Sequence, residues 1–131
     1  MSYYFNAVLK GKSFDEALEM VTEELKTEGF GVLTEIDVQG TLKKRIGADF
    51  KKYKILGACN PHFAHKALQS EDKIGVFLPC NVVVEENGTG EIEVAIVDPV
   101  ASMISVKNEE LGSYAIEIQQ KLKNVISGLT K

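Results

Sequence analysis

The two cysteines of this 131-residue chain are its best candidates for chemistry, and they stand in mirrored contexts. Cys59 precedes an Asn-Pro pair in YKILGACNPHFAHKAL, whereas Cys80 stands between Pro and Asn in GVFLPCNVVV. Two histidines, His62 and His65, follow closely after Cys59. Because thiolate and imidazole are the ligands that zinc prefers, these four side chains are the first candidates for a metal site.

The helical pattern around the histidines argues against that metal site. The spacing C-x2-H-x2-H is not a standard zinc pattern. On a helix, His62 and His65 fall on the side opposite to the apolar residues of the segment, which are Phe63, Ala64, Ala67 and Leu68. We therefore expect the histidines to face water or a partner, and the sequence predicts neither a metal site nor a cofactor.

Thiol chemistry at Cys59 alone is a second hypothesis. The residue lies just before a predicted helix N-terminus, where the helix dipole and free N–H groups favour a thiolate and lower the pKa of the thiol. The alternative is an inert cysteine, since free cysteines are among the most buried residues of folded proteins. We favour the inert interpretation. If thiol chemistry does occur, Cys59 is the candidate catalytic residue.

Three helices are predicted by their caps and their periodicity. Ser13 and Glu16 form an S-x-x-E capping box, and Gly29 is placed to end that helix in a left-handed conformation. Asn60 is expected to cap a short helix whose first residue is Pro61, a position where the missing N–H costs nothing. A long amphipathic helix is expected from about residue 108 to about residue 127.

The strands lie between these helices and predict an α+β fold. Short β-rich segments are expected at residues 3–9, 30–38 and 53–59, with one helical turn in GTLKKRIG and a hairpin within residues 74–98. The order β-α-β-β-α-β-β-α implies a curved, mostly antiparallel sheet of about five strands that grips the long C-terminal helix. Pro79 cannot donate to a ladder, so it is expected at an edge or a bulge.

The register of the hairpin decides which face of the sheet carries Cys80. If the Asn-Gly pair at positions 87 and 88 forms a two-residue turn, Val83 faces Ile92, and Cys80 joins the face of the glutamates in the second strand. Val82 and Val84 would then point outward, which suggests a covered face and a subunit contact.

A longer loop moves Cys80 to the other face of the sheet, because shifting the register by one residue exchanges the two faces of a strand. With a five-residue loop at positions 86–90, Cys80 shares the core face with Ile92, Val94 and Ile96. Tight-turn chemistry favours the two-residue turn, and like charges at Glu85 and Glu91 disfavour the longer loop.

The bulk composition limits the functional classes. With 44% hydrophobic and 26% charged residues, the chain has the composition of one folded domain over residues 1–131. A net charge of -4 argues against a nucleic-acid binder. The sequence shows no signal-peptide pattern and no apolar run of about 18 residues, so we expect a cytoplasmic protein with free thiols and no membrane contact.

One segment is locally basic and could hold an anion. Between residues 43 and 54 there are six cationic side chains against one aspartate. Near the free N–H groups of the helix at Asn60, such a segment could bind a phosphate or a carboxylate. We favour the simpler interpretation of a solvated charged face.

Several segments together resemble a known family. YKILGACNPHFAHKAL, GVFLPCNVVV and IEVAIVDPVASM, with EELKTEGFGVL before them, are similar to the domain-of-unknown-function family three hundred and two. The resemblance spans essentially the whole chain and implies a helix-grip or TATA-binding-protein-like fold, commonly as a homodimer. The matching positions are Cys59, Asn60, Pro61, Ala64, Ala67, Leu68, Pro79, Cys80, Asp98, Pro99 and Met103. The family implies no catalytic residue.

The sequence is most consistent with a non-enzymatic, homodimeric binding module. We expect a small ligand, with an anion as one candidate class, in a cleft between the sheet and the long helix. The predicted ligand-binding residues are Cys59, Asn60, Pro61, Pro79, Cys80 and Asn81. A thiol-dependent redox enzyme or sensor using Cys59, and a purely structural dimer, remain as alternatives.

Overall fold

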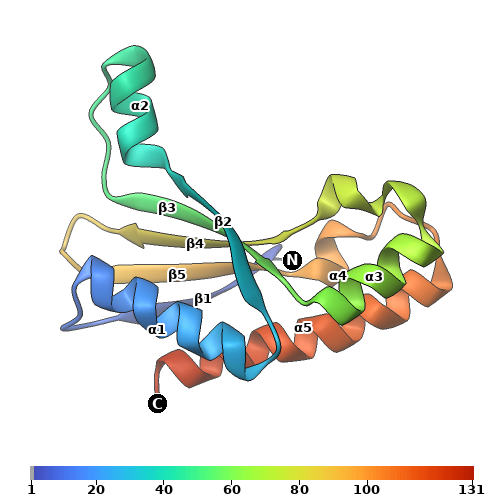
Figure 1. The fold of residues 1–131 in the computed structure, drawn as a ribbon. Coiled ribbons are helices and arrows are strands. Elements are labelled where there is room, and N and C mark those ends of the chain that lie inside the picture. The colour runs from blue at the N-terminus through green and yellow to red at the C-terminus, as the bar shows by residue number, and fades with distance from the viewer. Residues whose placement is uncertain (1) are drawn as a thin grey trace.

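A computed structural model describes residues 2–131 and contains a five-stranded antiparallel sheet with helices (Figure 1). The order along the chain is β1 (Tyr4–Leu9), α1 (Phe14–Thr27), β2 (Gly31–Asp37), α2 (Val38–Ile46), β3 (Tyr53–Cys59), α3 (Pro61–Ser70), the 3-10 helix η1 (Asp72–Phe77), β4 (Cys80–Glu86), β5 (Ile92–Val97), α4 (Pro99–Ser102) and α5 (Glu109–Leu129). This confirms the predicted α+β class. The order of elements agrees with the prediction except that α2 is longer than one turn, that η1 replaces the start of the predicted hairpin, and that α4 is added.

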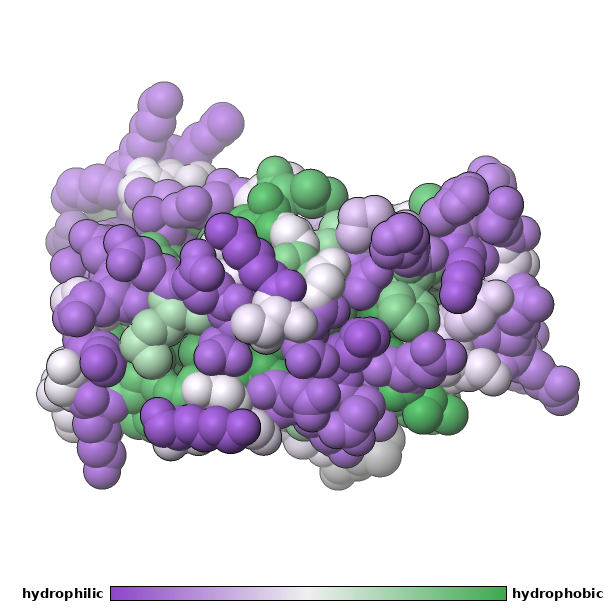
Figure 2. Space-filling view, turned by 60° about the horizontal axis from the view of Figure 1, so that its bottom comes forward, coloured by the Kyte–Doolittle hydropathy of each residue, from purple (hydrophilic) through white to green (hydrophobic). Residues whose placement is uncertain are grey.

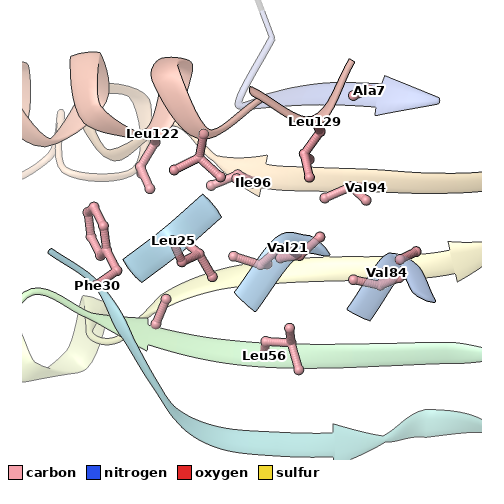
Figure 3. Packing of buried hydrophobic residues seen from close by; sticks show 14 of the residues in the cluster. Ala7, Val21, Leu25, Phe30, Leu56, Val84, Val94, Ile96, Leu122 and Leu129 are labelled. Atoms are coloured by element: carbon pink, nitrogen blue, oxygen red, sulfur yellow. The ribbon is translucent and has the colours of Figure 1, made fainter. Parts of the chain in front are cut away.

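The strands are arranged in the order β1-β5-β4-β3-β2, and α1 and α5 pack against one face of the sheet. Side chains from that face and from the two helices converge on one core (Figure 3). Val21 and Leu25 of α1, Val84 of β4 and Leu122 of α5 have no exposed surface in this core. Burial of such side chains contributes about 1.5–3 kcal/mol each to the gross stability of the fold.

The caps of the helices form as the sequence predicted. Ser13 accepts a hydrogen bond from the backbone N–H of Glu16, whose carboxylate accepts one in return from the N–H of Ser13. Gly29 follows α1 with a φ of +85°. Asn60 caps α3, as predicted, and accepts a hydrogen bond from an N–H of the first turn. Asn108, which was predicted only as the approximate start of the long helix, caps α5 in the same way. These local signals therefore set three of the helix starts.

The hairpin register differs from both alternatives that the sequence offered. Val83 pairs with Ala95 and Val84 with Val94, and residues 87–91 join the strands, with a hydrogen bond from the N–H of Asn87 to the carbonyl of Glu91. Gly90, with a φ of +83°, provides the left-handed residue that was expected at the Asn-Gly pair. The prediction of a two-residue turn is wrong because both strands must bury the same set of alternate residues.

This register also corrects the predicted orientation of β4. Val82 and Val84 are fully buried in the core, so they do not form an outward-facing subunit contact. Cys80 shares their face and is buried. Pro79 lies immediately before the central strand β4, and not in an edge strand or a bulge.

The segment GTLKKRIG belongs to a longer helix than expected. The helix α2 begins after Asp37, whose carboxylate accepts a hydrogen bond from the N–H of Gly40 at 3.0 Å, and it ends at Gly47. None of its residues is buried, and α2 projects from the body of the molecule (Figure 1). We call the segment from residue 38 to residue 52 the arm.

The helical side of the molecule is well covered by polar groups. With α1 and α5 turned toward the viewer, the surface is mainly hydrophilic, and hydrophobic side chains are visible only in separate areas (Figure 2). Within residues 2–131, no helix combines the length and apolar character that a membrane span requires.

Candidate functional site

The pairing of β3 with β4 brings the two cysteines to the same end of the sheet. Cys80 lies directly opposite Ala58, and Cys59 is the next residue of β3. Both cysteines are free thiols. Their proximity is therefore set by the β3–β4 ladder, and not by the hairpin register on which the sequence argument depended.

Both cysteines line one pocket between this end of the sheet, α3 and α5. The cavity has a volume of about 50 Å³, and none of the described residues 2–131 places a charged side chain in its wall. A single water requires roughly 10–15 Å³ by the same measure, so the cavity has room for a few water-sized groups. The lining residues come from segments far apart in the chain, namely β3, α3, the turn before β4, α4 and α5.

Four of the six predicted ligand-binding residues line this pocket, and two do not. Cys59, Asn60, Pro79 and Cys80 are in its wall. Pro61 is exposed at the first position of α3 and does not line it. Asn81 is exposed on the opposite face of the sheet, because alternate residues of a strand point to opposite sides.

Asn60 is held by the fold on both ends of its side-chain amide. Its Nδ2 donates to the backbone carbonyl of Glu28 at 3.4 Å, and its Oδ1 accepts from the N–H of Phe63 at 3.5 Å. A Cβ atom at Gly29 would lie 3.1 Å from this Nδ2. With 8% of its surface exposed, Asn60 fixes the start of α3 against the end of α1 and shapes the pocket.

Gly57 allows Pro79 to approach the sheet. A Cβ atom at Gly57 would lie 2.7 Å from Cγ of Pro79, closer than carbon atoms pack, and would also collide with the hydroxyl of Thr34. The absence of a side chain at this position therefore lets the proline and the threonine cover the strand. The proline in turn forms part of the pocket wall.

The two thiols are not activated by their surroundings. Burial raises the pKa of Cys59, although the nearby helix N-terminus would act in the opposite direction. Burial, with a smaller contribution from Cys59, raises the pKa of Cys80 to about 11. Both groups are therefore mainly protonated at neutral pH, which does not favour the nucleophilic thiolate that the redox hypothesis requires.

The histidines and the basic segment lie away from the pocket. His62 and His65 are exposed, as predicted, but Leu68 is also exposed and does not join the apolar side of α3. Among residues 2–131, no group of three His, Cys, Asp or Glu side chains is placed to hold a metal ion.

The basic segment ends at Lys54, near the start of β3, and the rest of that strand separates it from the helix at Asn60, about 20 Å at the usual rise per residue. Lys43, Lys51 and Lys54 pair with acidic side chains instead, namely Asp49, Glu85 and Glu35. The interpretation of a charged solvated face, which the sequence favoured, therefore fits better than an anion site next to Asn60.

A lysine at the rim of the pocket was not identified from the sequence. The Nζ atom of Lys66 lies 5.4 Å from the ring centroid of Phe63 and 6.0 Å from that of Tyr114. Both rings line the pocket, one from α3 and the other from α5. The i, i+3 spacing of Phe63 and Lys66 was the available signal, but the role of Tyr114 depends on how the two helices pack.

Comparison with known proteins agrees with this architecture. The family model described as "Domain of unknown function DUF302" matches residues 5–129. The chain belongs to the DUF302 family. A similar solved structure is that of an uncharacterised conserved DUF302 protein from Bacillus stearothermophilus, which is 28% identical, with a TM-score of 0.90 over 98% of this chain and 99% of that one. No curated protein matches.

The second face of the DUF302 sheet is not covered by α1 or α5 and contains a shallow hollow. Asn81, Val83 and Ala95 belong to it, with Tyr53 and two glutamates at one side. Glu85 and Glu93 are directly opposite each other, and their charges are offset by Lys51 and by a hydrogen bond from Asn6. Asn81 is thus part of a separate surface.

Proposed function

We propose that this DUF302 protein is a non-enzymatic binding module for a small, mainly apolar ligand. The observation that carries the proposal is the pocket at Cys59 and Cys80, whose wall, as far as the structure describes the chain, is built from uncharged side chains. Small-molecule sites are typically concave and lined mainly by apolar and aromatic groups. The two cysteines act here as apolar wall residues rather than as nucleophiles.

The wall of the pocket limits what the ligand can be. Asn60 is the most polar buried residue of the wall, and its Nδ2 and Oδ1 atoms already have hydrogen-bond partners within the fold. A charged group buried in the pocket would lose its hydration without gaining a counter-charge, which costs several kcal/mol. An anionic ligand, which the sequence suggested, therefore fits only if its charge stays at the rim.

We also propose that the protein is a cytoplasmic homodimer that pairs through the sheet face opposite to α1 and α5. Val8 and Ile36 on that face are 40% and 50% exposed, and the hollow beside them contains Glu85 and Glu93. The arm offers complementary charge, because Lys44 and Arg45 are exposed on α2. The same arrangement, with α5 held against a twisted sheet, is consistent with the helix-grip class that the family resemblance implied.

The thiol-dependent alternative has a direct test. If Cys59 were a working nucleophile, iodoacetamide would label it rapidly at neutral pH. The raised pKa of this thiol predicts labelling slower than that of free cysteine, and the burial of Cys80 predicts labelling of that residue only on unfolding. Labelling of Cys59 at or above the rate of free cysteine would instead support the redox alternative.

The binding proposal is tested by titration with 1-pentanol, followed by amide chemical shifts. We expect shifts at Cys59, Ala64 and Ala115, which line the pocket. The variant Ala64→Leu fills part of the cavity from a half-buried position and should abolish these shifts. Ala48→Leu, in the arm, is the matched control and should leave them unchanged. Shifts scattered over the surface, or equal in all three proteins, would contradict the proposal.

A further inference from the structure

Lys66 places a positive charge at the rim of the apolar pocket. Its ammonium group lies within 6.0 Å of the centroids of two aromatic rings that form the wall, so the rings hold the charge of this exposed side chain beside the cavity. Phe63 belongs to α3 and Tyr114 to α5, so the ammonium group lies close to both helices.

The electrostatics of this rim are mixed. Burial raises the pKa of Tyr114, and the carboxylates of Glu110 and Glu117 raise it further. These two acidic side chains are thus close enough to oppose an incoming anion. Lys66 itself makes no salt bridge of 4.0 Å or less within residues 2–131, since every ion pair found there involves other residues.

We propose that the ligand of the pocket is a short aliphatic carboxylic acid, with its hydrocarbon chain in the cavity and its carboxylate at Lys66. This inference rests on the proposed binding function and adds the chemical class of the ligand. The apolar wall matches the hydrocarbon chain, and Lys66 is the cation at the rim that can bind the terminal carboxylate despite the opposing charges of Glu110 and Glu117. Lys66 is then the residue that sets specificity.

The dimensions of the cavity limit the length of the chain. A volume of about 50 Å³ corresponds to a few water-sized groups, and therefore to a chain of roughly three to five carbons. A longer chain would have to displace Phe63 or Met103, which are half-buried members of the wall. The carboxylate would stay hydrated on its outer side, which avoids the cost of burying a charge.

The experiment compares three probes of equal chain length, which are pentanoate, 1-pentanol and pentylammonium. Binding is followed by amide shifts of Cys59 and Ala115 in the wild-type protein and in Lys66→Met. We expect the wild type to bind pentanoate about two- to fivefold more tightly than 1-pentanol, because a solvent-exposed ion pair contributes modestly to affinity. Pentylammonium should bind most weakly.

Variants of Lys66 separate recognition of the carboxylate from binding of the hydrocarbon chain. Lys66→Met should remove the preference for pentanoate while retaining the binding of 1-pentanol, and Lys66→Glu should shift the preference to pentylammonium. Lys73→Met, at an exposed lysine of η1 that pairs with Asp72, is the matched control and should keep the wild-type preference. Glu110→Gln should strengthen the binding of pentanoate.

Two results would overturn the inference in different ways. If Lys66→Met keeps the wild-type ratio of pentanoate to 1-pentanol, the carboxylate is not held by Lys66, although the binding function stands. If none of the three probes shifts the amides of the pocket, the binding function itself is wrong. Salt provides a further readout, since raising the ionic strength should weaken the binding of pentanoate and leave the binding of 1-pentanol unaffected.

Discussion

The side-chain amide of Asn60 donates to the backbone carbonyl of Glu28, and the two residues join the start of α3 to the end of α1. The contact of 3.4 Å is long, but it occurs at a side chain with 8% of its surface exposed. The same side chain caps α3. A residue that was predicted from the sequence to bind ligand is therefore one that holds two helices in place around the pocket.

Replacing Asn60 by alanine should lower the stability of the fold. The change removes the cap of α3 and leaves the carbonyl of Glu28 without this donor, which together should cost about 1–2 kcal/mol. Denaturant unfolding measures the difference. Asn81→Ala is the matched control, since Asn81 is exposed and should change the free energy of unfolding by less than about 0.5 kcal/mol. Equal losses in both variants would contradict this role.

Substitution of Gly57 should be costly for a steric reason. In Gly57→Ala, the new Cβ would overlap with Pro79 and Thr34, and relief of this overlap should destabilise the protein by about 1–3 kcal/mol. Gly31→Ala, also in a strand, places its Cβ in open space and should be nearly neutral. A Gly57→Ala variant with wild-type thermal stability would show that the proline does not depend on this glycine.

The raised pKa of Cys80 predicts a loss of stability at alkaline pH. The thiol titrates at about 11 in the folded state against 9.0 as the reference, so the folded state retains the proton that the unfolded state releases. This contribution is fully present below pH 9 and is lost as the pH rises from 9 to 11. It amounts to roughly 2–3 kcal/mol at the rate of about 1.4 kcal/mol per pKa unit.

The alkaline effect is checked by comparing unfolding of the wild type and of Cys80→Ala at several pH values. The variant should lose less stability between pH 9 and pH 11 than the wild type, because it lacks this titrating group. The loss of stability of Cys59→Ala between pH 9 and pH 11 should be closer to that of the wild type. Parallel curves for the wild type and Cys80→Ala would show that Cys80 is not buried as a protonated thiol.

The proposed dimer predicts a response to charge on the open face of the sheet. Val83 lies on that face in the central strand, and Val83→Lys should produce monomers by placing a charge in the interface. Val76→Lys, at a side chain of η1 that is 80% exposed, should leave the dimer intact. Light scattering gives the mass. A wild-type protein that is monomeric at high concentration would disprove the proposed pairing.

The local elements of this fold could be predicted because their signals lie within a few residues. Ser13, Asn60 and Asn108 are caps whose side chains bond to the first turn that follows, so the helix starts could be predicted from the sequence. The helix α2 is longer than the single turn expected in GTLKKRIG. In the structure Asp37 caps the helix earlier, and Gly40 lies within its first turn.

The hairpin shows where a local signal gives the wrong answer. The Asn-Gly pair favours a two-residue turn, but that turn would place the alternate valines of β4 and the alternate isoleucines of β5 on opposite faces. Burial of Val82, Val84, Ile92 and Ile96 on one face outweighs the preference of the turn, and Gly90 provides the required conformation. Requiring the alternate apolar residues of both strands to share one face would have placed Val82 and Val84 in the core.

The sequence predicted a cleft between the sheet and the long helix and four residues of its wall, but not the rest of the pocket, because the rest depends on the packing of separate elements. Cys59 and Cys80 become neighbours through the β3–β4 ladder, and Tyr114 lines the same pocket only because α5 packs against α3. Asn81 was grouped with Cys80 because the two are adjacent in the chain, although adjacent residues of a strand point to opposite faces.

The most direct test of the binding pocket is a crystal structure of the protein under xenon pressure. Apolar cavities in proteins bind xenon, and its anomalous signal locates the atom. We predict a xenon atom within the cavity bounded by Cys80, Phe63 and Ile118, and its loss in Ala64→Leu. A wild-type crystal in which this cavity is closed by its own side chains and contains no xenon would contradict the proposed function.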